Sequence, residues 1–93
     1  IKNILIPLVD NVRYLLVPGC TVFAMTSLAR GFYQAHLHSG PIWDFAAAAI
    51  IVQETGGILT DYKGKPINWK KKWLDVVASN GLVHDEIIKL INK

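Results

Sequence analysis

The spacing of apolar and polar positions divides the chain into alternating helical and extended segments. Helices are predicted over 20–30, 44–55 and 83–92, and a short, broken helix over 2–12, which has Pro7 in its middle. Strands are predicted over 12–17, 32–38, 58–62 and 74–79, with a loop over 39–41. Because strands alternate with helices, the pattern is typical of a layered α/β domain.

The helix predicted over 44–55 has a distinctive start and end. Asp44 stands at its first position, where we expect the carboxylate to accept unpaired backbone N–H groups and to be held ionised by them and by the helix dipole. A fixed anionic oxygen is a good ligand for a hard cation such as Mg²⁺. The pair Gly56-Gly57 follows the helix and permits a tight reversal into the next strand.

Composition limits the class of protein. The 93 residues suffice for one small domain, and a hydrophobic content of 52% is high for so short a chain, which predicts that it associates or belongs to something larger. We expect neither a membrane span nor a signal peptide. The single cysteine excludes an intrachain disulfide and favours a cytoplasmic setting. The net charge of +3 is too modest to argue for a nucleic-acid partner.

A longer motif carries a family resemblance. It consists of Gly40-Pro41-Ile42-Trp43-Asp44-Phe45-Ala46-Ala47, followed by Glu54-Thr55-Gly56-Gly57. This motif resembles the second signature of the inositol monophosphatase family, and the resemblance covers nearly the whole chain. It implies that residues 1–93 form a single domain, a layered α/β sandwich that is the C-terminal sub-domain of the inositol monophosphatase/fructose-1,6-bisphosphatase-like fold. The family's N-terminal metal-binding portion is absent from it.

The resemblance also implies a function. The resemblance implies that the full-length protein is a Mg²⁺-dependent phosphomonoesterase. The expected activity is hydrolysis of inositol phosphate or a related small sugar or nucleotide phosphate. By resemblance, Asp44 is a metal ligand. Gly19, Cys20 and Thr21, which open the helix over 20–30, would line the substrate pocket. His38 stands near the position where the family has a glutamate that contacts substrate hydroxyls.

Two departures from the family pattern limit what this chain does alone. The family's other metal ligands come from a Glu and from an Asp-Pro-x-Asp-Gly-Thr motif, and neither occurs here. We therefore assign no catalytic residue within the chain and expect the fragment alone to be inactive. The expected partners are a small phosphorylated substrate, the missing N-terminal portion of the same fold, and a second copy in a dimer. The alternative is a non-catalytic binding or oligomerisation module of this fold.

Several residues allow a second interpretation. His36 and His38 alternate on a strand, so both rings point to one face and could join Asp44 in a two-histidine-one-carboxylate metal site. We favour the simpler interpretation, a polar strand end. Cys20 at a helix start could be reactive, but a small first-turn residue is the simpler interpretation.

The remaining polar candidates are expected to be unremarkable surface residues. The lysines at 70–72, between Trp69 and Trp73, could bind nucleic acid, and we favour a solvated loop. His84 and Asp61 are interpreted as surface and turn residues.

Overall fold

The computed structural model describes residues 2–12, 15–16 and 19–92. Within these residues the chain forms a mixed α/β domain, which confirms the predicted fold class. Its elements are α1 (Lys2–Asn11), α2 (Thr21–Ala29), β1 (Ala35–Pro41), the 3-10 helix η1 (Ile42–Asp44), α3 (Ala46–Glu54), β2 (Ile58–Thr60), β3 (Trp73–Ser79) and α4 (His84–Ile91). None of the described helices is long and apolar enough to cross a membrane.

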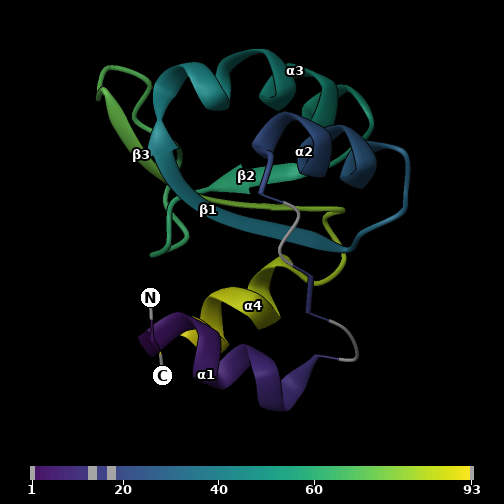
Figure 1. Cartoon of the computed structure of the whole chain (residues 1–93), viewed down its shortest axis with the longest axis vertical. Helices are drawn as coiled ribbons and strands as arrows, with labels where there is room; N and C mark the ends of the chain where they lie inside the picture. The colour runs from purple at the N-terminus through teal and green to yellow at the C-terminus, as the bar shows by residue number, and fades with distance from the viewer. Residues whose placement is uncertain (1, 13–14, 17–18, 93) are drawn as a thin grey trace.

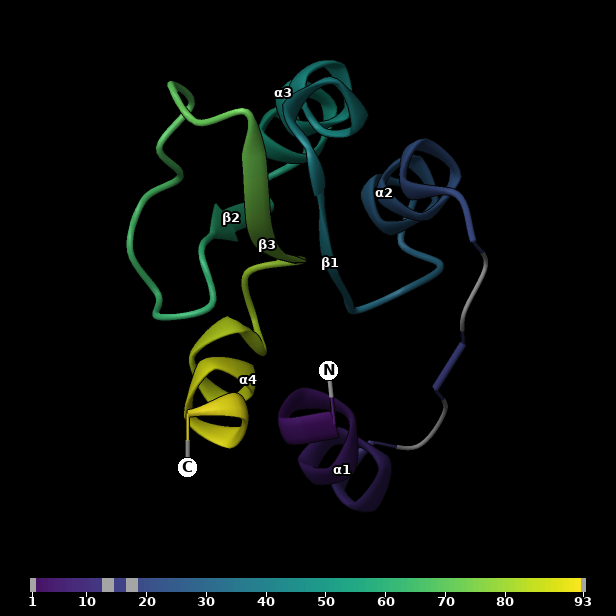
Figure 2. The same ribbon diagram turned by 60° about the vertical axis from the view of Figure 1, so that its left-hand side comes forward.

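The elements form three layers around a small sheet. The strand order is β1-β3-β2, and both outer strands are antiparallel to β3. Helices α2 and α3 cover one face of the sheet, whereas α4 and α1 lie against each other on the opposite face (Figures 1 and 2). The register of β1 on β3 runs from Ala35 opposite Ser79 to Pro41 opposite Trp73.

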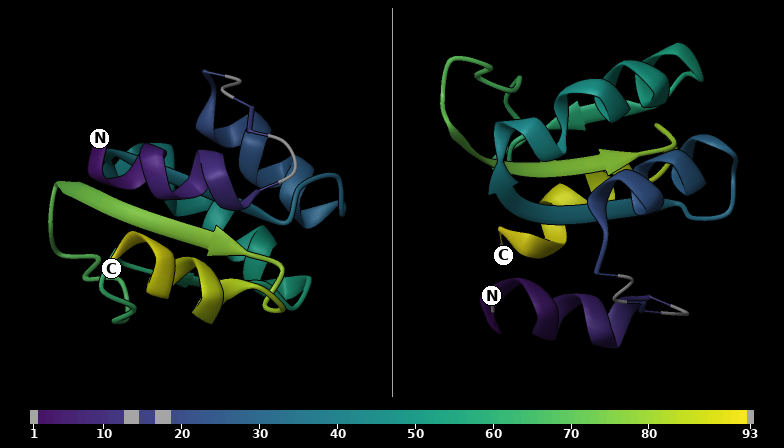
Figure 3. Two further views of the ribbon diagram at one scale, coloured as in Figure 1. Left: turned by 90° about the horizontal axis from the view of Figure 1, so that it is seen from below. Right: turned by 45° about the horizontal axis from the view of Figure 1, so that its top comes forward.

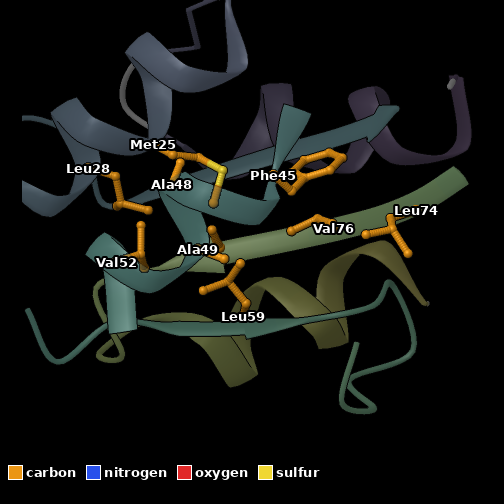
Figure 4. Packing of buried hydrophobic residues seen from close by; sticks show 10 residues of the cluster. Met25, Leu28, Phe45, Ala48, Ala49, Val52, Leu59, Leu74 and Val76 are labelled. Carbon is orange, nitrogen blue, oxygen red and sulfur yellow. The ribbon is translucent and has the colours of Figure 1, made fainter. Parts of the chain in front are cut away.

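The hydrophobic core lies between the sheet and helices α2 and α3 (Figure 4). Alternate residues of β3 face these helices, as the period of two in a strand requires. Ala48 and Ala49 are buried in α3, and their small side chains allow the helix to approach the sheet closely. The buried cluster comprises Met25, Leu28, Phe45, Ala48, Ala49, Val52, Leu59, Leu74, Val76 and Ala78.

The two glycines after α3 have different structural roles, and both support the predicted reversal. Gly56 has a φ of +86°, a conformation that favours glycine. Gly57 lies where a Cβ atom would be 2.5 Å from Val52 Cγ1 and 2.7 Å from the Ser79 carbonyl oxygen. The glycine pair therefore brings β2 against the end of α3 and needs no catalytic explanation.

His84 is buried, so its interpretation as a surface residue was wrong. Its side chain is 4% exposed, with Nε2 2.7 Å from Thr60 Oγ1 and Nδ1 2.7 Å from Ser79 Oγ. The Thr60 hydroxyl donates to the Asp61 carbonyl, so Nε2–H donates to Thr60 and Nδ1 accepts from Ser79. His84 thus joins α4 to the sheet. Asp61 lies in a turn as expected, accepting the N–H groups of Lys63 and Lys65.

Two predicted strands differ from the observed structure. The strand expected over 12–17 is wrong where it can be judged, because residues 12, 15 and 16 have no regular secondary structure; the rest of that range lies outside the described residues. Strand β1 starts later than predicted and includes 39–41, which were expected to be a loop. Pairing with β3 up to Trp73 keeps Gly40 and Pro41 extended despite their turn-like composition.

Candidate functional site

Three element ends meet at one edge of the molecule. Helices α2 and α3 run in the same direction, so their amino ends point to the same side, and β1 ends on that side as well (Figures 1 and 3). The chain passes from β1 through η1 directly into α3. An edge that gathers helix amino ends carries partial positive charge from their unpaired N–H groups, which suits an anionic ligand.

His38 and Asp44 converge at this edge over Gly40. Gly40 is buried, and a Cβ atom added to it would lie 3.0 Å from His38 Nε2 and 3.2 Å from Asp44 Oδ2. The His38 ring packs at a tilt against Phe45, with ring centroids 5.8 Å apart. Gly40 therefore lets an imidazole nitrogen and a carboxylate oxygen approach each other closely, at a position where a Cβ atom would crowd both.

Asp44 does not cap α3, so that prediction was wrong. It is the last residue of η1; Phe45 is the N-cap residue of α3, and no side chain caps the helix. The Phe45 N–H donates to the Ile42 carbonyl at 3.0 Å, which tightens the turn and begins the helix one residue later. Within the described residues the Asp44 carboxylate has no hydrogen-bond partner, which leaves its oxygens free for a ligand.

The predicted pocket residues Gly19, Cys20 and Thr21 lie at the amino end of α2. Gly19 has a φ of +74°, and Cys20 is the extended N-cap residue, whose carbonyl accepts the Ala24 N–H at 3.0 Å. The Cys20 side chain is exposed and makes no capping hydrogen bond, whereas Thr21 is buried. The first-turn N–H groups of α2 are therefore not capped by Cys20.

His36 lies behind His38 and is sealed from solvent at one nitrogen. The two rings stack with centroids 5.9 Å apart, which confirms that both point to one face. His36 Nε2 is buried and has no partner within the described residues. Burial, and secondly the charge of His38, lower the pKa of His36 to about 4, so this ring is neutral at neutral pH.

The two-histidine-one-carboxylate alternative is not supported. The described residues hold no group of three or more His, Cys, Asp or Glu side chains close enough to share a metal ion. Asp44 and His38 alone remain at the edge as candidate ligand-binding side chains.

The lysine-rich segment also reaches this edge, which the sequence did not indicate. The Ile42 N–H donates to the Lys72 carbonyl at 2.8 Å, and Trp73 pairs with Pro41. Thirty residues separate the two segments in the sequence, so only strand pairing brings them together. The aromatic and β-branched run at the start of β3 was the available signal.

Two cavities lie elsewhere. One of about 280 Å³ beside α4 is lined by Asp61, Tyr62, Lys63, Asp75, Ile91 and Asn92. Another of about 160 Å³ lies at the carboxyl ends of α2 and α3, between residues such as Leu28 and Asn80. Neither of these two cavities is lined by Asp44 or His38.

The fold and this edge define a layered α/β protein with a free carboxylate beside two helix amino ends that no side chain caps. The sequence matches the model of the inositol monophosphatase family over residues 2–93, and the chain belongs to this family. The resemblance found in the sequence is thereby confirmed.

Relatives and solved structures agree with the family assignment. Fructose-1,6-bisphosphatase/inositol-1-monophosphatase of Thermotoga maritima is 49% identical over 51 residues, which are 55% of this chain and 19% of that protein. Inositol-1-monophosphatase of Bacillus subtilis is 29% identical over 90 residues, 95% of this chain and 33% of the relative. The solved structure of a Thermotoga maritima inositol monophosphatase superposes with a TM-score of 0.86 at 30% identity, covering 98% of this chain and 35% of that one.

A further solved structure, an inositol monophosphatase/NADP phosphatase complexed with Mg²⁺ and phosphate, has a TM-score of 0.73 at 25% identity, over 80% of this chain and 28% of the other. The chain spans about a third or less of the length of the relatives it matches.

The described residues suit a magnesium ion only in part. Mg²⁺ is commonly bound through one or two carboxylates together with water and substrate phosphates. Asp44 offers one carboxylate that has no hydrogen-bond partner within the described residues and that lies with His38 over Gly40. Because no cluster of three ligating side chains exists in the described part of the chain, other ligands would have to come from outside these residues.

Proposed function

We propose that the natural polypeptide containing these residues is a Mg²⁺-dependent phosphomonoesterase, and that residues 1–93 form its C-terminal domain. The substrate class is inositol phosphate or a related small sugar or nucleotide phosphate. Support comes from the family assignment and from relatives that bear the names of such phosphatases. The observation that carries the proposal is the pair of free polar atoms, Asp44 Oδ2 and His38 Nε2, converging over Gly40 at the helix amino ends.

Each side chain at this edge has a role in the proposal. Asp44 would contribute one carboxylate ligand to magnesium, which supplies positive charge to the phosphate group when it is bound. The uncapped N–H groups around Gly19, Cys20 and Thr21 would hold phosphate or hydroxyl oxygens. His38 would contact a substrate hydroxyl, because its Nε2 lies together with Asp44 Oδ2 over Gly40.

The chain alone is expected to be inactive. One carboxylate does not fix a magnesium ion in the geometry that catalysis needs, and the described residues offer no further cluster. The proposal therefore concerns the natural polypeptide, and the isolated 93 residues serve as a negative comparison.

The test measures phosphate release from a panel of small phosphomonoesters as Mg²⁺ is titrated. Asp44→Asn removes the ligand charge with little change in shape, and we expect phosphate release to fall about 100-fold or more. Asp85→Asn is the control, because Asp85, like Asp44, is an acidic residue near a helix start, in the first turn of α4; Asp85 is exposed and Asp44 is half-buried. The control should retain activity within about twofold.

Either of two results would count against the proposal. Absence of Mg²⁺-dependent release by the unmodified polypeptide across the whole panel would refute the activity. Equal losses in the Asp44 and Asp85 variants would refute the assignment of Asp44.

A non-catalytic binding or oligomerisation module remains the second candidate, favoured by exposed apolar side chains. Val22 and Phe23 of α2 and Ile50 and Ile51 of α3 are each between 45% and 61% exposed. Exposed apolar groups of this size commonly mark contacts with another protein surface. A homodimer is the proposed assembly, and sedimentation of the natural polypeptide as a monomer would contradict it.

A further inference from the structure

Helix α4 is held on the sheet by contacts that are separate from the hydrophobic core. His84 at its start is hydrogen-bonded to β2 and β3, and Ile87 in its middle is buried. The core cluster comes from α2, from α3 with its N-cap residue, and from β2 and β3, and it contains none of the residues of α4. Helix α1 packs against α4 on the same side of the sheet (Figures 1 and 2). The packing of α2 and α3 on the sheet is therefore built without α4.

The hydrogen bonds of His84 require a neutral ring. Its Nε2–H donates to the Thr60 hydroxyl, because that hydroxyl donates to the Asp61 carbonyl. Its Nδ1 accepts from the Ser79 hydroxyl at 2.7 Å, and the Ser79 oxygen in turn accepts the Gly81 N–H at 3.1 Å. The side chain is 4% exposed, so water does not replace these partners.

Protonation of Nδ1 would break this arrangement. An Nδ1–H group donates and no longer accepts, so the Ser79 hydroxyl hydrogen would lose its acceptor. The imidazolium would also bring a positive charge between Thr60 and Ser79, two uncharged hydroxyls. Burial of a charge without an opposite charge as partner is costly. When α4 leaves the sheet, His84 is hydrated and takes up a proton readily, so acid favours the released state.

The charged groups around His84 do not form a buried partner for it. Asp85, the next residue of α4, is exposed, as is Asp10 near the end of α1. The turn between β3 and α4, residues 80–83, contains no charged residue. Burial lowers the pKa of His84, and the charge of Asp85 opposes this lowering. The neutral form is therefore favoured in the folded chain despite the neighbouring carboxylate.

We propose that His84, Thr60 and Ser79 form an acid-sensitive latch, whose protonation releases α4 and α1 from the sheet while α2 and α3 stay packed. The two states of α4 are docked and released, and the core cluster keeps the rest of the sheet covered in both. The latch is a property of the fold and does not depend on the proposed phosphatase activity.

Release of α4 would also reach the strand that carries His38. The Asn92 side chain, directly after α4, donates to the Tyr62 carbonyl at 2.6 Å. The Tyr62 hydroxyl lies 3.0 Å from the Ser39 hydroxyl, and Ser39 follows His38 in β1. Loss of the Asn92 bond therefore frees a residue that supports β1 behind the candidate site.

The test is amide hydrogen exchange of the natural polypeptide between about pH 7 and about pH 5, expressed as protection relative to an unfolded chain. We expect the protection of α4 to fall about 3- to 25-fold; the upper limit follows from a released His84 that titrates near 6.5. Protection of α2 and α3 should change less than about twofold. This range stays above the pKa of His36, which is about 4.

Three variants separate the latch from a general effect of acid. His84→Gln keeps a side-chain donor and acceptor but does not titrate, so protection of α4 should become independent of pH. Ser79→Ala removes the hydroxyl that favours unprotonated Nδ1, so protection should be lost at a pH higher by about half a unit or more. Ser39→Ala is the matched control, because this hydroxyl lies on the same face and bonds to Asp75 instead of His84. Its midpoint should be unchanged.

Three results would overturn the latch. The first is the same pH dependence in His84→Gln as in the unmodified protein. The second is a parallel loss of protection in α2, α3 and α4, which would mean global unfolding by acid. The third needs no variant: the NMR titration of the His84 ring in the unmodified protein should share its midpoint with the loss of α4 protection, and midpoints more than about one unit apart would exclude the link. Because phosphate release is not measured, failure of the proposed function leaves this result unaffected.

Discussion

Polar side chains on the two faces of the sheet differ in whether they have hydrogen-bond partners. On the α2 and α3 face, His36 Nε2 is buried without a partner and the Asp44 carboxylate has none within the described residues. On the α4 face, both nitrogens of His84 are hydrogen-bonded, and the Ser39 hydroxyl lies 2.6 Å from Asp75 Oδ1 and 3.0 Å from the Tyr62 hydroxyl.

This difference distinguishes the α4 face, whose hydrogen-bonded side chains support the fold, from the α2 and α3 face, where polar groups lack partners. A satisfied polar network fixes one arrangement of the elements, because breaking any member leaves a buried group unpaired. Partnerless polar groups cost stability; the buried His36 Nε2 is closed to solvent, whereas the Asp44 carboxylate remains available to a ligand. The candidate site lies at the edge of the face that carries them.

The largest effect is expected in the core that supports the site. Phe45 is fully buried between the sheet and α3, and Phe45→Ala should lower the free energy of unfolding by about 3–5 kcal/mol. Ile87→Ala, on α4, is the matched change on the opposite face and should cost about 2–3 kcal/mol. Denaturant unfolding of the natural polypeptide measures both.

Phe45 also packs against the His38 ring, so its loss should weaken the proposed phosphatase activity more than the Ile87 change does. Equal activity in the two variants at temperatures where both are folded would contradict the link between this core and the site.

Smaller effects of opposite sign are expected from His84, which is buried, and from His36, whose Nε2 atom is buried. His84→Leu leaves the Ser79 and Thr60 hydroxyls without their partner and should cost about 1–3 kcal/mol of stability. His36→Leu removes a nitrogen that has no partner, so it should be neutral or stabilising by a few tenths to about 1 kcal/mol. If both variants lost the same stability in denaturant unfolding, the contrast between the faces would be wrong.

Sequence patterns predicted those elements whose positions are determined by neighbouring residues in the chain. Helix α2 lies within the predicted range 20–30 and is followed by Gly31, with a φ of +87°; the last helix was placed to within about a residue because its apolar spacing and charges agree. The tryptophan-aspartate and double-glycine motif identified the family, which in turn pointed to Asp44.

Features set by distant contacts could not be predicted. Burial of His84 depends on Thr60 and Ser79, which lie 24 and 5 residues away and meet it only when β2 and β3 pair. Helix α3 begins at Ala46 rather than at Asp44 because residues 42–44 form the 3-10 helix η1. The attachment of Lys72 to Ile42 is likewise a product of strand pairing.

The last effect expected is on the pH dependence of stability. Burial, and secondly the charge of His38, lower the pKa of His36 to about 4 in the folded chain, against 6.5 for a free histidine. The unfolded chain therefore takes up this proton first as pH falls. Stability contributed by neutral His36 is complete above about pH 6.5 and is lost between about pH 6.5 and 4.

The ring is only partly enclosed, so we expect this loss to be about 1–2 kcal/mol rather than the full value of the pKa difference. Unfolding free energies of the natural polypeptide, measured from pH 7 to pH 4, should fall less steeply in His36→Leu than in the unmodified protein. Subtraction of the two profiles removes the carboxylates and His84, whose pKa is also lowered by burial, against the opposing charge of Asp85. His38→Gln should flatten the profile slightly, because it removes the weaker cause; parallel profiles in all three proteins would mean that His36 is paired.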